Sequence, residues 1–269
     1  ALDTSPLRAK TMLNLDSEDE GHLLVSCAGG VTAQVELPLS FETGDGEKYV
    51  ISVSGLMGGH SGVEIDKGRA NACQIMGRVL YELYKEIPFS LCFLNGGLKD
   101  NAIPRQAEAV IVCPEKRQSE INTKIAVISS EIKHEFLETD PMILVEAKKT
   151  TLVEKELVMT KDSADKVITA LLCLPGGIQK MSFQMKGLVK TSLNLGIMKT
   201  ERDHFSLSFS VRSSVESEKR ALLERIICLT KTLGGTVTAI GDYPAWEYLE
   251  NSPLRDLMCR IFEEQYGRK

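Results

Sequence analysis

The chain of 269 residues is 43% hydrophobic and 26% charged, a composition that is typical of globular proteins and excludes wholesale disorder. Its formal net charge of -5 argues against a dedicated nucleic-acid-binding protein, because such proteins usually carry a basic face. No apolar run has the length of a membrane-spanning helix. The seven cysteines form no CxxC pair, so we expect free thiols in a reducing compartment, the cytoplasm.

The first 42 residues mix short apolar runs with turn residues. The runs Met12–Leu15 and His22–Cys27 predict strands, and apolar and polar residues alternate from Val31 to Leu37. Asp16 stands where the first strand ends, before an acidic turn. A strand that ends in an aspartate is a common way to present a carboxylate to a metal ion, but metal sites need several converging ligands, and a solvated acidic turn fits the same pattern.

From residue 43 onward, strand-like and helix-like periodicities alternate. Segments up to about residue 150 predict the order β-α-β-β-α-β, and segments from 151 to 242 repeat it approximately. We therefore predict an α/β (α+β) fold with two tandem split β-α-β sandwiches, in which helices cover one face of each antiparallel sheet. The predicted strands are 49–53, 89–94, 107–112, 142–147, 180–185, 191–198, 205–211 and 236–240, and the predicted helices are 66–86, 115–136, 161–172, 217–233 and 253–266.

A glycine-rich loop, Gly55–Gly62, joins the first of these strands to the first helix. Its four glycines allow the backbone to approach a ligand closely, but it lacks the signature of a phosphate-binding loop. His60 is held between glycines in this loop, where an imidazole can donate a hydrogen bond to a developing oxyanion. A turn histidine without a chemical role fits the same local pattern.

Two further polar side chains are candidates. Asn101 follows a glycine turn and precedes Ile103-Pro104, which places an amide side chain at a strand entrance. Arg212 ends an alternating strand, where a guanidinium suits bidentate recognition of a carboxylate. Taken alone, Asn101 is equally explained as a turn former and Arg212 as a solvated charge.

Five segments occur together in one order, which resembles that of the aminoacyl-histidine dipeptidases of the M20 metallopeptidase family. These bacterial enzymes cleave Xaa-His dipeptides such as carnosine. The resemblance runs from about residue 2 to the end of the chain. The segments are Leu15 to Gly21 with Cys27 to Gly30, Gly58 to Gly62 with Glu64-Ile65, Asn95-Gly96-Gly97, Asn101 to Arg105, and Tyr243-Pro244 with Trp246 and Asn251-Ser252-Pro253.

The resemblance implies a catalytic domain with two zinc ions, interrupted by a lid domain that closes over the dipeptide. Asp16 matches a zinc-ligand aspartate, and His60 matches the lid histidine that polarises the scissile carbonyl. Asn101 and Arg212 match lid residues that hold the substrate, with Arg212 at its terminal carboxylate. A zinc-bound water would be the nucleophile and a glutamate the general base. Arg69 stands where the family often has a different residue, so we assign it no role.

The remaining metal ligands of the family would precede Asp16 or follow the last residue. We therefore expect residues 1–42 and 243–269 to be catalytic-domain flanks of a lid domain formed by residues 43–242, with halves at about 43–150 and 151–242. The isolated chain should be inactive and should not retain stoichiometric zinc, whereas Asp16→Ala in the intact enzyme should lose metal and activity together. The expected partner is a dipeptide substrate. We expect binding neither to nucleic acid nor to a membrane, and the lid domain is a candidate surface for homodimer formation. The alternative is a non-catalytic ligand-binding or dimerisation module.

Overall fold

The computed structural model describes residues 6, 8–9, 11–15, 21–114, 116–150 and 156–268. Contacts divide the chain into a larger unit, Ala28–Glu247, and a smaller unit formed by Ala1–Cys27 and Tyr248–Lys269. The observed boundaries, at 27/28 and 247/248, differ from those expected at 42/43 and 242/243.

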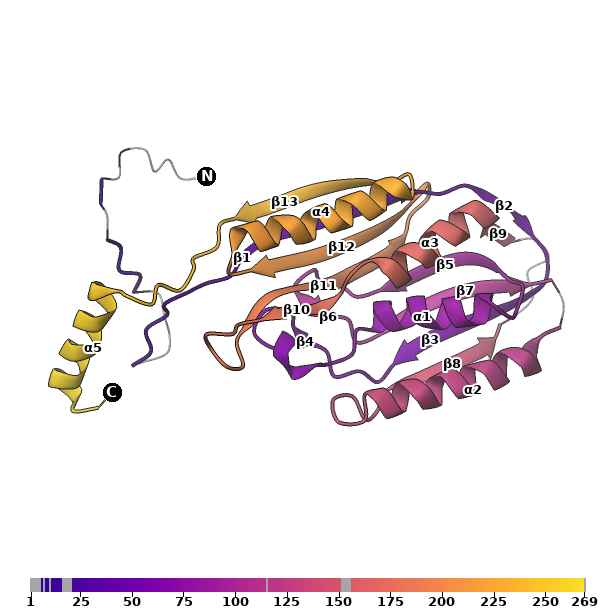
Figure 1. The fold of residues 1–269 in the computed structure, drawn as a ribbon. Coiled ribbons are helices and arrows are strands. Elements are labelled where there is room, and N and C mark those ends of the chain that lie inside the picture. Colours follow the sequence, from indigo (N-terminus) through magenta and orange to yellow (C-terminus); the bar gives the residue numbers. More distant parts are fainter. Residues whose placement is uncertain are drawn as a thin grey trace. The chain divides into compact units, whose positions relative to one another are not determined.

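The larger unit is built on one nine-stranded sheet in which every recorded strand pair is antiparallel (Figure 1). Its strands are β1 (Gly29–Pro38), β3 (Glu47–Ser54), β5 (Ser90–Gly96), β7 (Ala107–Cys113), β8 (Leu144–Lys149), β10 (Gly177–Met181), β11 (Val189–Thr200), β12 (His204–Ser213) and β13 (Thr236–Tyr243). The strand order is β13-β1-β12-β11-β5-β7-β3-β8, with β10 paired to β11. This antiparallel sheet confirms the predicted fold class.

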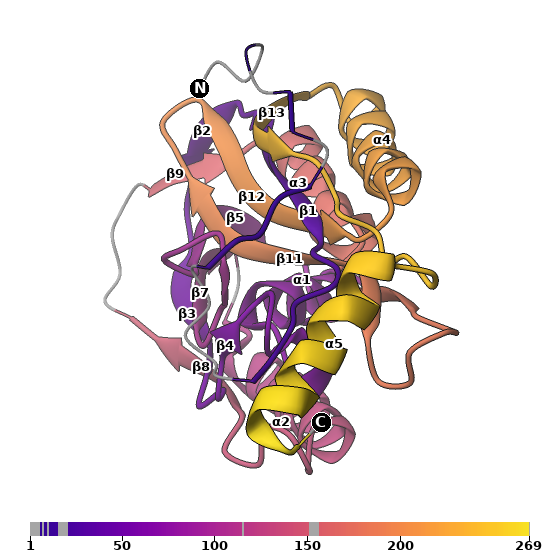
Figure 2. The same cartoon turned by 90° about the vertical axis from the view of Figure 1, so that its left-hand side faces the viewer.

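Four helices of the larger unit lie on one side of this sheet (Figures 1 and 2). They are α1 (Ala72–Tyr84), α2 (Gln118–Glu135), α3 (Lys161–Cys173) and α4 (Glu216–Thr232). Two short ladders and a 3-10 helix complete the unit, namely β2 (Phe41–Gly44) with β9 (Glu156–Met159), β4 (Gly59–His60) with β6 (Ala102–Ile103), and η1 (Ile65–Lys67). No described helix is long and apolar enough to cross a bilayer.

The sheet contains two β-α-β-β-α-β units that are nested rather than consecutive. One unit consists of β3, α1, β5, β7, α2 and β8, and its strands lie in the order β5-β7-β3-β8. The other consists of β1, α3, β11, β12, α4 and β13, and its strands lie in the equivalent order β11-β12-β1-β13. The first unit is therefore inserted between β1 and α3 of the second. The units join where Met198 and Lys199 of β11 pair with Gly96 and Asn95 of β5.

Strand β1 lies in the larger unit, whereas residues 1–42 were expected to form a catalytic-domain flank. It pairs with β12 on one side and β13 on the other, and Val31, Ala33, Val35 and Leu37 are buried along one of its faces. This period of two directs alternate side chains into the core under the helices. The same alternation is visible in the sequence, but the partners of β1 lie more than 150 residues away in the chain, so local pattern does not reveal its place.

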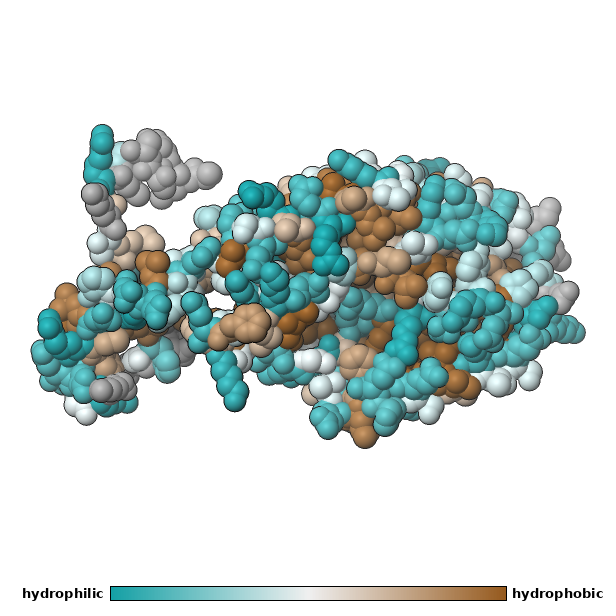
Figure 3. Space-filling model, viewed as in Figure 1, coloured by the Kyte–Doolittle hydropathy of each residue, from teal (hydrophilic) through white to brown (hydrophobic). Residues whose placement is uncertain are grey.

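A single core fills the space between the sheet and its helices, and the opposite face carries a smaller cluster. Cys92, Val110 and Val112 lie on that opposite face, where Val158 of β9 packs against them. Figure 3 shows the side of the larger unit that carries the helices, where hydrophilic side chains dominate and hydrophobic ones appear between the helices.

In the smaller unit, the predicted helix at 253–266 is confirmed as α5 (Pro253–Tyr266), capped by the Ser252 side chain, which accepts a hydrogen bond from the Arg255 amide. The two strands predicted before residue 28 do not form in the described residues 11–15 and 21–26. Met12 and Leu15 are 85% and 89% exposed, so no described segment buries this apolar run.

Candidate active site

His60 lies on a two-stranded ladder that also fixes the position of Asn101. In this ladder, Gly59 pairs with Ile103 and His60 pairs with Ala102. The Ser61 amide donates to the Asn101 carbonyl oxygen at 2.9 Å. The structure therefore brings two of the predicted site residues side by side, and both are exposed.

The hydrogen bonds of the His60 ring determine which nitrogen carries its proton. Nδ1 accepts from the amides of Gly62 and Val63, at 3.0 Å and 3.2 Å. A neutral imidazole that accepts at Nδ1 carries its hydrogen on Nε2. Within the described part of the chain no group accepts from Nε2, so the exposed ring offers an N–H donor to a ligand.

Arg212 and the His60 ring lie close together, and both are next to Gly62. A Cβ placed on Gly62 would lie 2.9 Å from Cε1 of His60 and 3.4 Å from Cζ of Arg212. The imidazole and the guanidinium therefore approach the same point. Arg212 is half-buried, and its Nη1 donates to the Tyr243 hydroxyl at 3.2 Å. Its Nε is buried and has no hydrogen-bond partner among the described residues.

Two buried asparagines hold the turn that carries Asn101 through hydrogen bonds. Nδ2 of Asn194 donates to the carbonyl oxygens of Asp100 and Ala102, at 3.2 Å and 2.8 Å. Asn71 donates to Oδ1 of Asn194 at 3.1 Å and also caps α1. Sequence reasoning missed both asparagines. The position of Asn71 just before an apolar helical run marks it as a helix cap, but no local pattern marks Asn194.

Three comparisons relate this arrangement to known proteins. Residues 51–140 match the family model described as a peptidase dimerisation domain, M20_dimer. Over 97% of its length, the chain is 29% identical to the cytosol non-specific dipeptidase of Escherichia coli (strain K12) and covers 54% of that protein. All of the chain superposes on 55% of the crystal structure of an aminoacylhistidine dipeptidase from Vibrio alginolyticus, with a TM-score of 0.93 and 27% identity.

The chain is similar to dipeptidases along its length, and residues 51–140 match an M20 domain. The resemblance inferred from the sequence motifs is therefore confirmed. The chain spans about half the length of both relatives.

A cluster of charged side chains holds the loop that presents His60. Glu64 accepts from the His60 amide at 2.8 Å and from Nζ of Lys67 at 2.6 Å. The hydrogen bond from Lys67, followed by that from the His60 amide, lowers the pKa of Glu64 to about 2. Arg69, to which the sequence analysis assigned no role, donates to the Gly58 carbonyl oxygen and to Glu64.

Gly59 is required in this brace. Its φ of +146° is strained for any residue with a side chain, and an added Cβ would lie 2.5 Å from Nη1 of Arg69. The absence of a side chain at Gly59 therefore allows charged side chains to pack directly against the backbone of this loop.

Asp140 fixes both ends of the segment that contains the loop. Its carboxylate is fully buried and accepts from the amides of Met57 and Ala70, at 2.7 Å and 2.8 Å. A single side chain thus holds the chain before and after His60. The sequence analysis did not single out Asp140, because its role depends on contacts 70 and 83 residues away.

We expect Glu64→Gln to lower kcat of the full-length protein about threefold to tenfold, because one charge-assisted hydrogen bond to the His60 loop is lost. The melting temperature should hardly change, since glutamine keeps the shape of a side chain that is 27% exposed. The lowered pKa means that native Glu64 braces the loop above pH 4.5 and loses this effect only as the pH falls toward 2. An unchanged kcat in steady-state assays at neutral pH would show that the brace does not control His60.

Asp140→Ala should destabilise the larger unit by about 2–4 kcal/mol, because two buried amides lose their charged acceptor. Urea denaturation measures this change. Asp162→Ala is the matched control, since Asp162 lies on the surface of α3, with a 75% exposed side chain that pairs with Lys166. A loss of stability equal to that of the control would contradict the role of Asp140.

Asp16, the predicted metal ligand, lies outside the described residues. Across residues 21–114, 116–150 and 156–268 and the few described before them, no three histidine, cysteine, aspartate or glutamate side chains are grouped so that they could hold a metal ion. A zinc site needs three or four such ligands. The described residues by themselves therefore do not fit a zinc centre.

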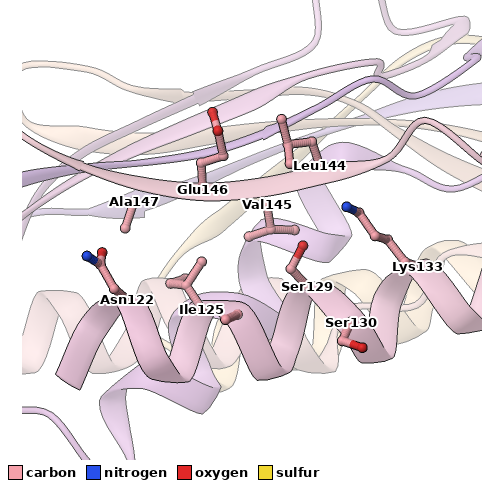
Figure 4. A pocket seen from close by; sticks show the side chains of 10 residues that line it. Asn122, Ile125, Ser129, Ser130, Lys133, Leu144, Val145, Glu146 and Ala147 are labelled. Atoms are coloured by element: carbon pink, nitrogen blue, oxygen red, sulfur yellow. The ribbon is translucent and has the colours of Figure 1, made fainter. Parts of the chain in front are cut away.

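A groove between α2 and β8 is separate from the His60 loop. It has a volume of about 590 Å³ and is lined by Ile125, Ser129 and Lys133 of α2 and by Val145 and Ala147 of β8, among others (Figure 4). His60, Asn101 and Arg212 do not line it. The candidate site is instead an open surface around Gly62.

Proposed function

We propose that this chain forms the substrate-closing part of a zinc-dependent dipeptidase that hydrolyses Xaa-His dipeptides. The observation that carries the proposal is the presentation of His60, whose Nδ1 is held by two backbone amides while Nε2–H remains free beside Arg212. The name of the Vibrio relative, aminoacylhistidine dipeptidase, supports the substrate class. The name of the Escherichia coli relative, cytosol non-specific dipeptidase, supports a cytosolic location.

His60 would act on the scissile carbonyl. During peptide hydrolysis this oxygen gains negative charge as the carbonyl carbon becomes tetrahedral. A neutral imidazole N–H that is fixed before the reaction stabilises this charge more than it stabilises the ground-state carbonyl. His60 therefore serves as an oxyanion donor and transfers no proton.

Arg212 and Asn101 would hold the substrate. The guanidinium of Arg212 supplies a charge and a planar set of donors for the terminal carboxylate. The Asn101 amide, on the ladder beside His60, adds a neutral donor and acceptor. Zinc, when bound in the whole enzyme, would lower the pKa of the attacking water. The matched dimerisation domain supports a homodimer.

The test is hydrolysis of glycyl-L-histidine and glycyl-L-leucine by the full-length protein, followed by the release of the free C-terminal amino acid. We expect histidine release that stops when a chelator removes the metal and returns when zinc is added. Release of leucine at the same rate would favour the broader specificity named for the Escherichia coli relative. Binding of glycyl-L-histidine without cleavage by the metal-loaded protein would instead indicate a non-catalytic module and overturn the proposal.

A further inference from the structure

We propose that Tyr243 is a positioning residue for Arg212, whose free edge it presents to the carboxylate of the substrate. This inference rests on the proposed function, in which Arg212 binds that carboxylate. Tyr243 would not touch the substrate; it would act by fixing the guanidinium through the hydrogen bond between Nη1 and the phenol oxygen, at 3.2 Å.

The register of the sheet places Tyr243 and Arg212 in one row. Gly30 of β1 pairs with Arg212 of β12 on one side and with Tyr243 of β13 on the other. Directly opposed residues of neighbouring antiparallel strands project from the same face of the sheet. The phenol must cross β1 to reach the guanidinium, and it does so over Gly30.

Gly30 is the feature that permits this crossing. A Cβ placed on Gly30 would lie 2.5 Å from the phenol oxygen and 2.7 Å from Cζ of Tyr243. Any larger residue at this position would therefore displace the ring. Because Gly30 has no side chain, the Tyr243 ring can pack directly against the backbone of β1.

The backbone beneath the ring is anchored by a buried lysine. Lys219 of α4 is 2% exposed, and its Nζ donates to the Tyr243 carbonyl oxygen at 2.7 Å and to the Asp242 carboxylate at 2.6 Å. Burial opposes the charge of Lys219, but its bonds to Asp242 and Glu216 outweigh this effect and raise its pKa. The ammonium group remains charged at neutral pH and holds the end of β13 in place.

The bond to Tyr243 decides which donors of Arg212 remain for a ligand. A guanidinium carries five N–H groups in a rigid plane. With one of the two Nη1 hydrogens donated to Tyr243, the edge formed by Nε and Nη2 keeps both of its donors, and this edge has the spacing of the two oxygens of a carboxylate. Nε is buried without a hydrogen-bond partner in the described part of the chain, which is the state expected of a donor that awaits a ligand.

The experiment measures KM and kcat of the full-length protein for glycyl-L-histidine and for its C-terminal amide, which lacks the carboxylate. We expect Tyr243→Phe to raise KM for the free acid about fivefold to tenfold, as expected for one lost hydrogen bond to a charged group. Its KM for the amide, its kcat and its melting temperature should stay within about twofold, or a few degrees, of the native values. Tyr81→Phe, which removes a phenol oxygen from the surface of α1, is the matched control and should change none of them.

Gly30→Ala gives an independent test, because it displaces the ring and leaves the phenol in the protein. It should reproduce the selective rise in KM, and adding it to Tyr243→Phe should produce little further change, as expected for two substitutions that act on one contact. Equal effects of Tyr243→Phe on acid and amide, or no effect on either, would overturn the inference.

The Arg212→Ala variant separates this inference from the proposed function. If Arg212→Ala raises KM for the acid selectively and Tyr243→Phe does not, Arg212 binds the carboxylate without help from Tyr243, and only the inference fails. If Arg212→Ala affects acid and amide equally, the carboxylate does not bind at Arg212, and the proposed function fails with it.

Discussion

Replacing His60 with alanine should lower kcat of the full-length protein about 100- to 1000-fold, equivalent to about 2.7–4 kcal/mol of lost transition-state stabilisation. The effect should fall mainly on kcat, because the Nε2–H donor interacts more strongly with the developing oxyanion than with the ground-state carbonyl. Steady-state kinetics with glycyl-L-histidine measure both parameters. Folding should be nearly unaffected, since the His60 ring is exposed and adds little to the core.

His204→Ala is the matched control for this prediction. His204 also lies in the larger unit, at the start of β12, where its ring contacts the Asp203 carboxylate at 2.8 Å. It is remote in sequence from the glycine loop and has no place in the proposed chemistry, so kcat should not change. A His60→Ala protein that unfolds, or one that keeps its kcat with metal bound, would make His60 a structural turn residue.

Arg212→Ala should raise KM for a dipeptide with a free carboxylate about 30-fold or more, corresponding to at least about 2 kcal/mol for the loss of a partly buried charged partner. In the proposed function, Arg212, in contrast to His60, contacts a group whose charge does not change during the reaction. Its removal should therefore weaken substrate and transition-state binding together, and KM should respond at least as clearly as kcat. Asn101→Ala should show the same pattern with a smaller change, because the amide is neutral.

Two variants control for charge and for the loss of a long side chain. Arg212→Lys keeps the positive charge but lacks the planar donors, so we expect it to recover only part of the lost affinity. Arg78→Ala removes another paired arginine, which binds Glu135 between α1 and α2, and KM should stay at its native value. Full recovery by lysine would show that charge alone binds the carboxylate.

The helices were largely predictable because each carries local signals. Pro253 at the first helical turn and the Ser252 cap define the start of α5, and its predicted bounds agree with the structure. The strands of the nested units were predictable in type from their alternation. The short strands β2 and β9 were missed, because their register joins Phe41 to Met159 across most of the domain.

The candidate site was predictable in its residues but not in its geometry. Glycine spacing singled out His60, and a strand end singled out Arg212. Their proximity across Gly62 depends on β11, which pairs with β12 and whose Asn194 holds the turn beside His60. Tyr243 was noted only as part of a motif. Its contact with Arg212 depends on the absence of a side chain at Gly30, which lies on β1 between the two residues. No local sequence pattern encodes that relation. Asp16 remains a prediction.

The most direct measurement is the inhibition constant of a phosphinic analogue of glycyl-L-histidine, in which a tetrahedral phosphorus carries the oxyanion. It should be determined for the native full-length protein and for His60→Ala. An oxyanion donor at His60 predicts that the inhibition constant rises about 100- to 1000-fold, in step with the fall in kcat, while KM for the dipeptide changes far less. An inhibition constant that is the same in both proteins would contradict the assignment of His60.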